Sequence, residues 1–257
     1  MVVVSYGKLI PSSILGRIEL GGINMHPSLL PKYRGPAPIY HCLLNGDEET
    51  GVTILELSLN KFDSGKILMQ QKVPVPSNAT FLQLSSQLAQ IGADCLLRSL
   101  SNLNEMVNKA TPQDDNQATH APKVKKGMGF VDFVQQTPEQ IYRIWRALGD
   151  TVGVHFRYLQ QHQDPVIVRL VNLVCPSDAK MSYQHVDADS YSPGMLKYDI
   201  KNELLFVKCK QEWLACSQLQ VLGRRVLTAK QFVNGYNLLN VKNPCTDHLF
   251  VKVNEPF

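Results

Sequence analysis

The chain has 257 residues, a mass of 28.8 kDa and a formal net charge of +4. Its hydrophobic content of 44% and charged content of 19% are those of an ordinary globular protein and argue against intrinsic disorder. No apolar run approaches the ~18 residues of a membrane-spanning helix, so we expect no membrane partner. The six cysteines include no C-x-x-C pair, and no His stands at metal-ligand spacing, so we expect neither a metal nor a disulfide framework.

The length and the charge distribution both suggest two parts. A chain of this size is typical of two domains, and a polar stretch at 108–118 reads as the linker between residues 1–107 and residues 119–257. Residues 1–118 carry 9 Lys and Arg against 10 Asp and Glu, whereas residues 119–257 carry 17 against 12. The basic excess of the second part favours a polyanionic partner, with a solvated mixed surface as the alternative.

The first part alternates between strands and helices. The expected strands are 2–6, which reads as a buried parallel strand, 22–26, 51–57 and 67–75. Pro36 is expected to open a helix that ends near Gly46, and Thr80 with Gln83 forms a capping box before a second helix. The first residues have neither the charged and apolar regions of a secretory signal nor an Arg- and Ser-rich transit pattern, so we expect neither in this stretch. This pattern predicts an α/β domain.

The second part begins with a helix and continues with short apolar segments. Thr137 and Gln140 form a capping box, with Pro138 at the first helical position. Segments 166–175, 194–198, 204–208 and 213–222 are spaced as the strands of a small antiparallel barrel. Thr228 and Gln231 then cap a last helix.

One stretch of the first part carries candidate chemistry. Side chains alternate along a strand, so Asn24 and His26 share a face of strand 22–26, which Pro27 ends. Downstream, Asp63 lies in the turn F-D-S-G before strand 67–75. Taken alone, the histidine reads as structural and the aspartate as a residue that satisfies local backbone N–H groups.

The joint pattern is more specific than its pieces. N-X-H-P-S-L-L-P-X-Y-R-G from Asn24, followed by D-S-G from Asp63, resembles the formyltransferases that use 10-formyltetrahydrofolate. The resemblance implies that Asn24 binds the oxyanion of a tetrahedral intermediate. It implies that His26 polarises the formyl oxygen and helps to move protons, while Asp63 holds His26 and orders a water. Such chemistry needs hydrogen-bond donors and a proton carrier, and no metal.

The same resemblance suggests where the formyl donor binds. Tyr6, Lys8, Leu9 and Ile10 match the strand end that meets the pterin through backbone groups. The family's folate-binding loop corresponds to Ser28, Leu29, Leu30 and Pro31.

The likeness along most of the chain is to the methionyl-tRNA formyltransferase family, in its mitochondrial form. It rests on Y-R-G-P-A-P-I from Tyr33, T-H-A-P-K from Thr119 and L-T-A-K-Q-F from Leu227. It implies the C-terminal part of a Rossmann-like formyltransferase domain, then a small OB-like β-barrel that binds tRNA. The implied partners are folate and initiator methionyl-tRNA, with tRNA contacts from Arg34, Lys123, Lys125 and Lys126. A solvated surface remains the alternative for any single lysine. The implied protein is a monomer of the mitochondrial matrix.

The start of the chain departs from the family pattern. The β/α units that should come first are missing, which predicts a catalytic domain incomplete at its N-terminus and a bare edge on strand 2–6. Two alternatives to the methionyl-tRNA enzyme therefore stay open. One is a truncated chain without catalysis that still binds RNA, and the other is a different 10-formyltetrahydrofolate-dependent transferase or hydrolase.

Overall fold

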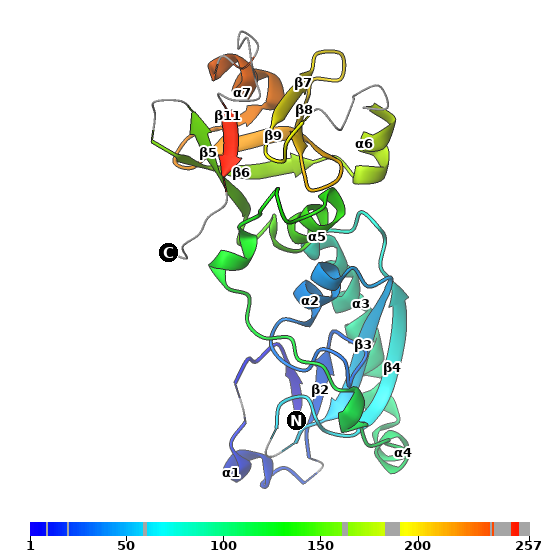
Figure 1. Cartoon of the computed structure of the whole chain (residues 1–257). Coiled ribbons are helices and arrows are strands. Elements are labelled where there is room, and N and C mark those ends of the chain that lie inside the picture. The colour runs from blue at the N-terminus through cyan, green and yellow to red at the C-terminus, as the bar shows by residue number, and fades with distance from the viewer. Residues whose placement is uncertain are drawn as a thin grey trace. The chain divides into compact units, whose positions relative to one another are not determined.

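The computed structural model describes residues 1–8, 10–19, 21–58, 61–160, 164–182, 191–236, 238 and 248–251. The chain divides into two compact units, Met1–Val124 and Lys125–Phe257 (Figure 1). The division lies later in the chain than the linker expected at 108–118. None of the helices within the described ranges has the length and the apolar character needed to cross a membrane.

The first unit is built on a four-stranded sheet in the order β1-β2-β3-β4. Its strands are β1 (Val2–Val4), β2 (Ile23–His26), β3 (Glu49–Glu56) and β4 (Ile67–Pro74). β1 and β2 are parallel, and the other neighbours are antiparallel. β3 is paired on both edges, and six consecutive residues from Thr50 to Leu55 are buried.

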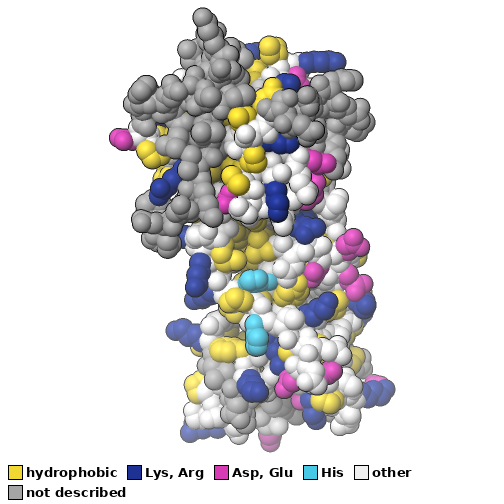
Figure 2. Space-filling model, in the orientation of Figure 1, with side chains coloured by type: hydrophobic (Ala, Val, Ile, Leu, Met, Phe, Trp, Pro, Cys, Tyr) yellow, Lys and Arg dark blue, Asp and Glu magenta, His cyan; other side chains and the backbone are white. Residues whose placement is uncertain are grey.

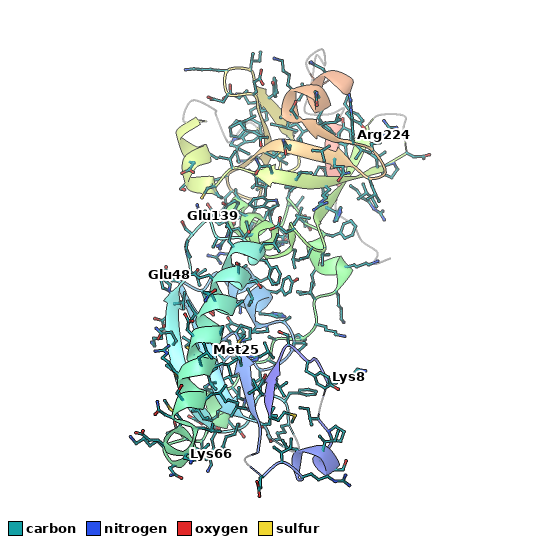
Figure 3. The ribbon with its side chains drawn as sticks, turned by 180° about the vertical axis from the view of Figure 1, so that it is seen from behind. Lys8, Met25, Glu48, Lys66, Glu139 and Arg224 are labelled. Carbon is teal, nitrogen blue, oxygen red and sulfur yellow. The ribbon has the colours of Figure 1, made fainter. Side chains whose placement is uncertain are left out.

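A long helix covers one face of this sheet. α3 (Phe81–Ser101) packs on β2, β3 and β4, and the capping box of Thr80 and Gln83 at its start is confirmed. Met25 of β2 lies against this helix (Figure 3), where a Cβ on Gly92 would be 2.9 Å from the Met25 side chain. Gly92 therefore lets the helix approach the strand closely. A short helix, α4 (Leu103–Asn108), follows.

Two expectations for the first unit need correction, and one short helix was not expected. α2 (Pro38–Asn45) begins at Pro38 rather than Pro36, because Ala37 has a non-helical backbone and serves as its N-cap. β1 is parallel and has the expected bare edge, but it is not the buried strand that its sequence predicted, since Val2 and Val4 are 46% and 44% exposed. The short helix α1 (Ser12–Leu15) carries no signal that the sequence analysis used.

The polar segment expected to be a linker is bonded to the first unit. The backbone of Thr111 exchanges two hydrogen bonds with Ile67 at the start of β4. Further on, the backbone of Arg34 donates to Thr119 and accepts from Ala121. A 3₁₀ turn, η1 (Asp115–Gln117), lies between these two attachments. Residues 111–121 thus form a strap across the loop that follows β2, and we call them the strap.

The second unit is built on a seven-stranded antiparallel sheet. Its order is β11-β5-β6-β9-β8-β7, and β10 pairs with β9. The strands are β5 (Val154–Gln160), β6 (Val166–Leu173), β7 (Leu196–Asp199), β8 (Leu204–Lys208), β9 (Trp213–Val221), β10 (Val226–Thr228) and β11 (His248–Val251). Within the described residues no pairing joins β7 to β11. A β-rich second domain is therefore confirmed, while the closure of a barrel is not shown.

Helices flank this second sheet. α5 (Pro138–Leu148) and α7 (Ala229–Gly235) begin at the predicted capping boxes of Thr137 and Thr228, so both predictions are confirmed. The 3₁₀ turn η2 (Lys126–Gly129) precedes α5, and α6 (Pro176–Ser182) follows β6. The sequence analysis missed β5, although Val154, Phe156 and Tyr158 alternate there and are buried. It also missed α6, β10 and β11.

Candidate active site

The candidate site is a cavity of about 390 Å³ in the first unit. It lies at the carboxyl ends of β1 and β2, which meet at one edge of the sheet because these two strands are parallel. Ligands of open α/β sheets commonly bind at this edge. The cavity lining includes Tyr6, Lys8, Ile10, Asn24, His26, Gly35, Lys61, Phe62, Asp63 and Lys123.

Strand β2 aims two polar side chains at this cavity. Asn24 and His26 lie two residues apart and so occupy the same face of the strand, opposite Met25. His26 is only 4% exposed, whereas Asn24 is half-buried. The predicted juxtaposition of an amide and an imidazole is therefore present in the structure.

Asp63 joins these two residues from the turn between β3 and β4. Its Oδ1 accepts a hydrogen bond from Asn24 Nδ2 at 3.2 Å and lies 3.6 Å from His26 Nδ1. The other oxygen, Oδ2, accepts from the backbone N–H of Gly35 at 2.9 Å. The backbone of Asp63 is left-handed, with a φ of 51°. The turn thus points a carboxylate into the cavity, where the sequence pattern alone allowed a purely local role.

A backbone carbonyl fixes the protonation of His26. The Nε2 atom lies 2.9 Å from the carbonyl oxygen of Tyr33. Because a carbonyl only accepts, Nε2 carries the hydrogen in the neutral ring, and the Nδ1 lone pair faces Asp63. Burial lowers the pKa of His26, while the nearby Asp63 charge and the Tyr33 contact raise it, with a net lowering. His26 is therefore a neutral imidazole at pH 7, with Nδ1 able to accept a proton.

Comparison with known proteins identifies the family of the chain. The model for formyl transferase matches residues 1–100, and the model for the formyl transferase C-terminal domain matches residues 123–237. The mitochondrial methionyl-tRNA formyltransferase of Mus musculus is 36% identical over 91% of this chain and 59% of its own length. The methionyl-tRNA formyltransferase of Caldicellulosiruptor saccharolyticus is 33% identical over 93% of this chain and 71% of its own length. The chain belongs to the methionyl-tRNA formyltransferase family.

Solved structures agree with this family at the level of the fold. The structure of HypX from Aquifex aeolicus in complex with tetrahydrofolic acid has a TM-score of 0.63 at 18% identity and covers 93% of this chain and 39% of that one. WlaRD, a sugar 3N-formyl transferase, has a TM-score of 0.56 at 14% identity and covers 87% of this chain and 73% of that one. The chain spans 59% of the length of the human mitochondrial family member, to which it is 34% identical.

The residues expected to meet the pterin of the formyl donor lie largely at the cavity. Tyr6, Lys8 and Ile10 line it, in the segment that follows β1, and Lys8 is labelled there in Figure 3. Tyr6 is 59% exposed. Leu9 lies outside the described residues.

The residues of the expected folate-binding loop are not among those that line the cavity. Ser28 is fully buried, and its hydroxyl donates to the carbonyl of Lys32 at 2.6 Å. The backbone N–H of Leu30 donates to the Thr53 hydroxyl at 3.1 Å, and a cis peptide bond joins Leu30 to Pro31. Leu29 packs near β3, where a Cβ on Gly51 would lie 2.6 Å from its side chain. The contacts of this loop are thus with itself and with β3.

The four basic residues expected to bind tRNA have different settings. Lys123 is exposed and lines the cavity, at the end of the first unit. Lys125 and Lys126 are exposed at the start of the second unit. Lys and Arg side chains are spread over both units on the face drawn in Figure 2. Arg34 is only 7% exposed, with its Nη1 2.8 Å from Asp115 Oδ1 in the strap.

Sequence reasoning missed three groups that hold the site together. They are the carbonyl of Tyr33, the N–H of Gly35 and the side chain of Gln113. Two are backbone groups, which no residue type reveals. Gln113 lies in the polar strap, 50 residues from its partner Asp63, and only the fold brings them together.

Proposed function

We propose that this chain transfers the formyl group of 10-formyltetrahydrofolate to the amino group of methionyl-tRNA. The observation that carries the proposal is the convergence of Asn24, His26 and Asp63 at one cavity. The names of three relatives support it, since they are methionyl-tRNA formyltransferases that are 33–36% identical to this chain. The product, formylmethionyl-tRNA, would serve translation initiation.

Asn24 is the proposed donor to the oxyanion. Attack of an amine on the formyl carbon gives a tetrahedral adduct whose oxygen gains negative charge. The Asn24 amide nitrogen carries two hydrogens, and the contact with Asp63 uses one of them. We assign the other to the adduct oxygen. One donor of this kind lowers the barrier by about 3–4 kcal/mol.

His26 and Asp63 are the proposed proton carriers. The attacking amine loses one proton and the folate nitrogen gains one when its bond to the formyl carbon breaks, so no proton is consumed overall. The neutral His26 accepts at Nδ1, and Asp63, 3.6 Å from that atom, stabilises the imidazolium that results. Return of the proton to the leaving nitrogen restores the neutral ring.

The size and lining of the cavity fit a folate. Its volume of about 390 Å³ is within the usual range for small-molecule sites. Leu15, Leu55, Leu57 and Phe62 provide an apolar surface for a flat ring system. We assign the pterin to the segment of Tyr6, Lys8, Leu9 and Ile10. Ser28, Leu29, Leu30 and Pro31 are proposed as the family's folate-binding loop. The donor is a co-substrate, and the proposal includes no metal.

The acceptor is proposed to be a tRNA bound through exposed lysines. Lys123 would reach an acceptor end at the cavity, and Lys125 and Lys126 would contact phosphates from the second unit. The basic excess of residues 119–257 supports the same role. Arg34, expected to contact tRNA, enters the proposal as an anchor of the strap because it is buried. We further propose that the protein is a monomer and acts in the mitochondrial matrix.

Formyl transfer from 10-formyltetrahydrofolate to methionyl-tRNA by purified chain 1–257 tests this function. We expect formylmethionyl-tRNA from the parent chain and from a His120→Ala control, which changes an exposed histidine of the same unit. We expect none from His26→Ala. A soluble parent chain that binds tRNA but forms no product would contradict the catalytic proposal. Formyl transfer to another amine, or release of formate in its place, would reassign the acceptor.

A further inference from the structure

We propose that Gln113 is a positioning residue that sets the Asp63 turn against Asn24 and His26. The inference rests on the proposed function for its catalytic consequence, whereas the contacts themselves are independent of it. Gln113 lies in the strap, half-buried, and none of its atoms lines the cavity.

The carboxamide of Gln113 is engaged on all its sides. Its Nε2 donates to the backbone carbonyls of Asp63 and Gly65, at 2.9 and 2.8 Å. Its Oε1 accepts from Nε and Nη2 of Arg34, at 3.0 and 2.7 Å. Both donors and both lone pairs of the amide are therefore used, and this fixes which way the amide points.

The two carbonyls that Gln113 binds belong to Asp63 itself and to Gly65, two residues further along the turn. Asp63 has a φ of 51°, a conformation that non-glycine residues adopt only when their surroundings hold them in it. Gly65 lies so close to β3 that a Cβ would approach the carbonyl oxygen of Glu56 to 1.9 Å. The turn is thus held by β3 on one side and by the Gln113 amide on the other. Its carboxylate is thereby directed at Asn24, His26 and Gly35.

Arg34 holds Gln113 in place from the loop that follows β2. Its guanidinium donates to Gln113 and pairs with Asp115, while its backbone pairs with Thr119 and Ala121 of the strap. The next residue, Gly35, donates its N–H to Asp63. The loop after β2 therefore holds the Asp63 turn twice, through a backbone N–H and through Gln113.

Only a glutamine satisfies both partners at this position. A glutamate keeps the acceptor for Arg34 but turns an oxygen towards two carbonyls. A methionine has a similar length and neither donates nor accepts hydrogen bonds of this strength. An ångström of displacement in a catalytic group lowers rate on the order of 100-fold. Loss of the two donors should therefore act on turnover more than on binding.

Two substitutions separate positioning from simple support of Arg34. We expect Gln113→Met and Gln113→Glu each to lower kcat on the order of 10- to 100-fold, with KM for methionyl-tRNA unchanged. The control is Gln117→Met, which changes an exposed glutamine of the same strap that donates to Asp114. If Gln113 only supported Arg34, the glutamate would keep that contact and retain activity, which would overturn the proposal.

A second readout does not depend on activity. Asp63 raises the pKa of His26, so a turn that moves away from His26 should let this pKa fall. We expect NMR titration of the His26 ring to show a lower midpoint in Gln113→Met than in the parent chain and in Gln117→Met. An unchanged midpoint in folded Gln113→Met would overturn the proposal. Circular dichroism verifies that each variant is folded. An inactive parent chain would count against the proposed function, but the NMR titration would still test the position of the Asp63 turn.

Discussion

The Asp63 carboxylate faces His26 across 3.6 Å, from Oδ1 to Nδ1, while the same oxygen accepts a hydrogen bond from Asn24. The two effects on His26 oppose each other, since burial favours the neutral ring and the carboxylate favours the charged one. Burial dominates, so the ring is neutral but close to a group that stabilises its protonated form. This is the balance that a proton carrier near neutral pH requires.

Removal of the Asp63 charge should disable proton transfer while it leaves the fold in place. Asp63→Asn keeps the size of the side chain but loses the stabilisation of protonated His26. We expect kcat for formyl transfer to fall about 100- to 10,000-fold. A matched Asp94→Asn change, on the exposed surface of α3, should leave the rate unchanged. Full activity of Asp63→Asn would show that the carboxylate has no part in the reaction.

Loss of the Asn24 amide should mainly reduce transition-state stabilisation. We expect Asn24→Ala to lower kcat about 100- to 1,000-fold, because one oxyanion donor is removed. Steady-state kinetics over a range of donor and acceptor concentrations would measure this. The control is Asn104→Ala in α4, where the residue is exposed. A rise in KM without a fall in kcat would instead indicate that Asn24 binds the ground state.

The buried His26 should make the stability of the chain depend on pH. Its folded-state pKa lies below the ordinary value of 6.5, so it contributes stability above about pH 6.5 that is lost as the pH falls below that value. The pKa of His155 is also lowered by burial, so this residue adds to the loss of stability as the pH falls. Urea unfolding of the parent chain and of His26→Gln at pH 7.5 and 5.5 would measure the free energy of unfolding at each pH. The variant should lose less free energy of unfolding between the two pH values, and equal losses would show that His26 does not contribute.

Gly65 should tolerate no side chain. An alanine there would meet the Glu56 carbonyl at 1.9 Å and push the Asp63 turn off β3. We expect Gly65→Ala to lower the free energy of unfolding by about 1–3 kcal/mol. Urea denaturation measures the change. Gly127→Ala is the control, since a Cβ at Gly127 meets no atom within 4 Å. Equal stability of the two variants would contradict the close approach.

Local patterns predicted much of the fold. The capping boxes at Thr80, Thr137 and Thr228 correctly marked three helix starts because cap chemistry involves residues three apart. The side-by-side placement of Asn24 and His26 followed from strand alternation. The start of α2 was misplaced because Pro36 and Pro38 both fit a first helical position, and only the backbone of Ala37 decides between them.

The support of the site could not be predicted in the same way. Hydrogen bonds from Gln113 to the Asp63 turn and from Tyr33 to Thr119 join residues that are 50 and 86 positions apart. A polar segment has the composition of a linker whether or not it is bonded to a neighbouring loop. The bare edge of β1 was expected from the family pattern, whereas its apolar sequence wrongly predicted a buried strand.

The bonded strap limits where this protein can be cut. A catalytic fragment that ends at residue 107 would lose Gln113, Asp115 and Thr119, and with them the partners of the Arg34 guanidinium and of the Tyr33 backbone N–H. Asn24, His26 and Asp63 would all be present, yet the Asp63 turn would have lost its hydrogen bonds from Gln113. A fragment that ends at Val124 would keep every one of these contacts. The first unit therefore includes the strap as well as the segments that carry Asn24, His26 and Asp63.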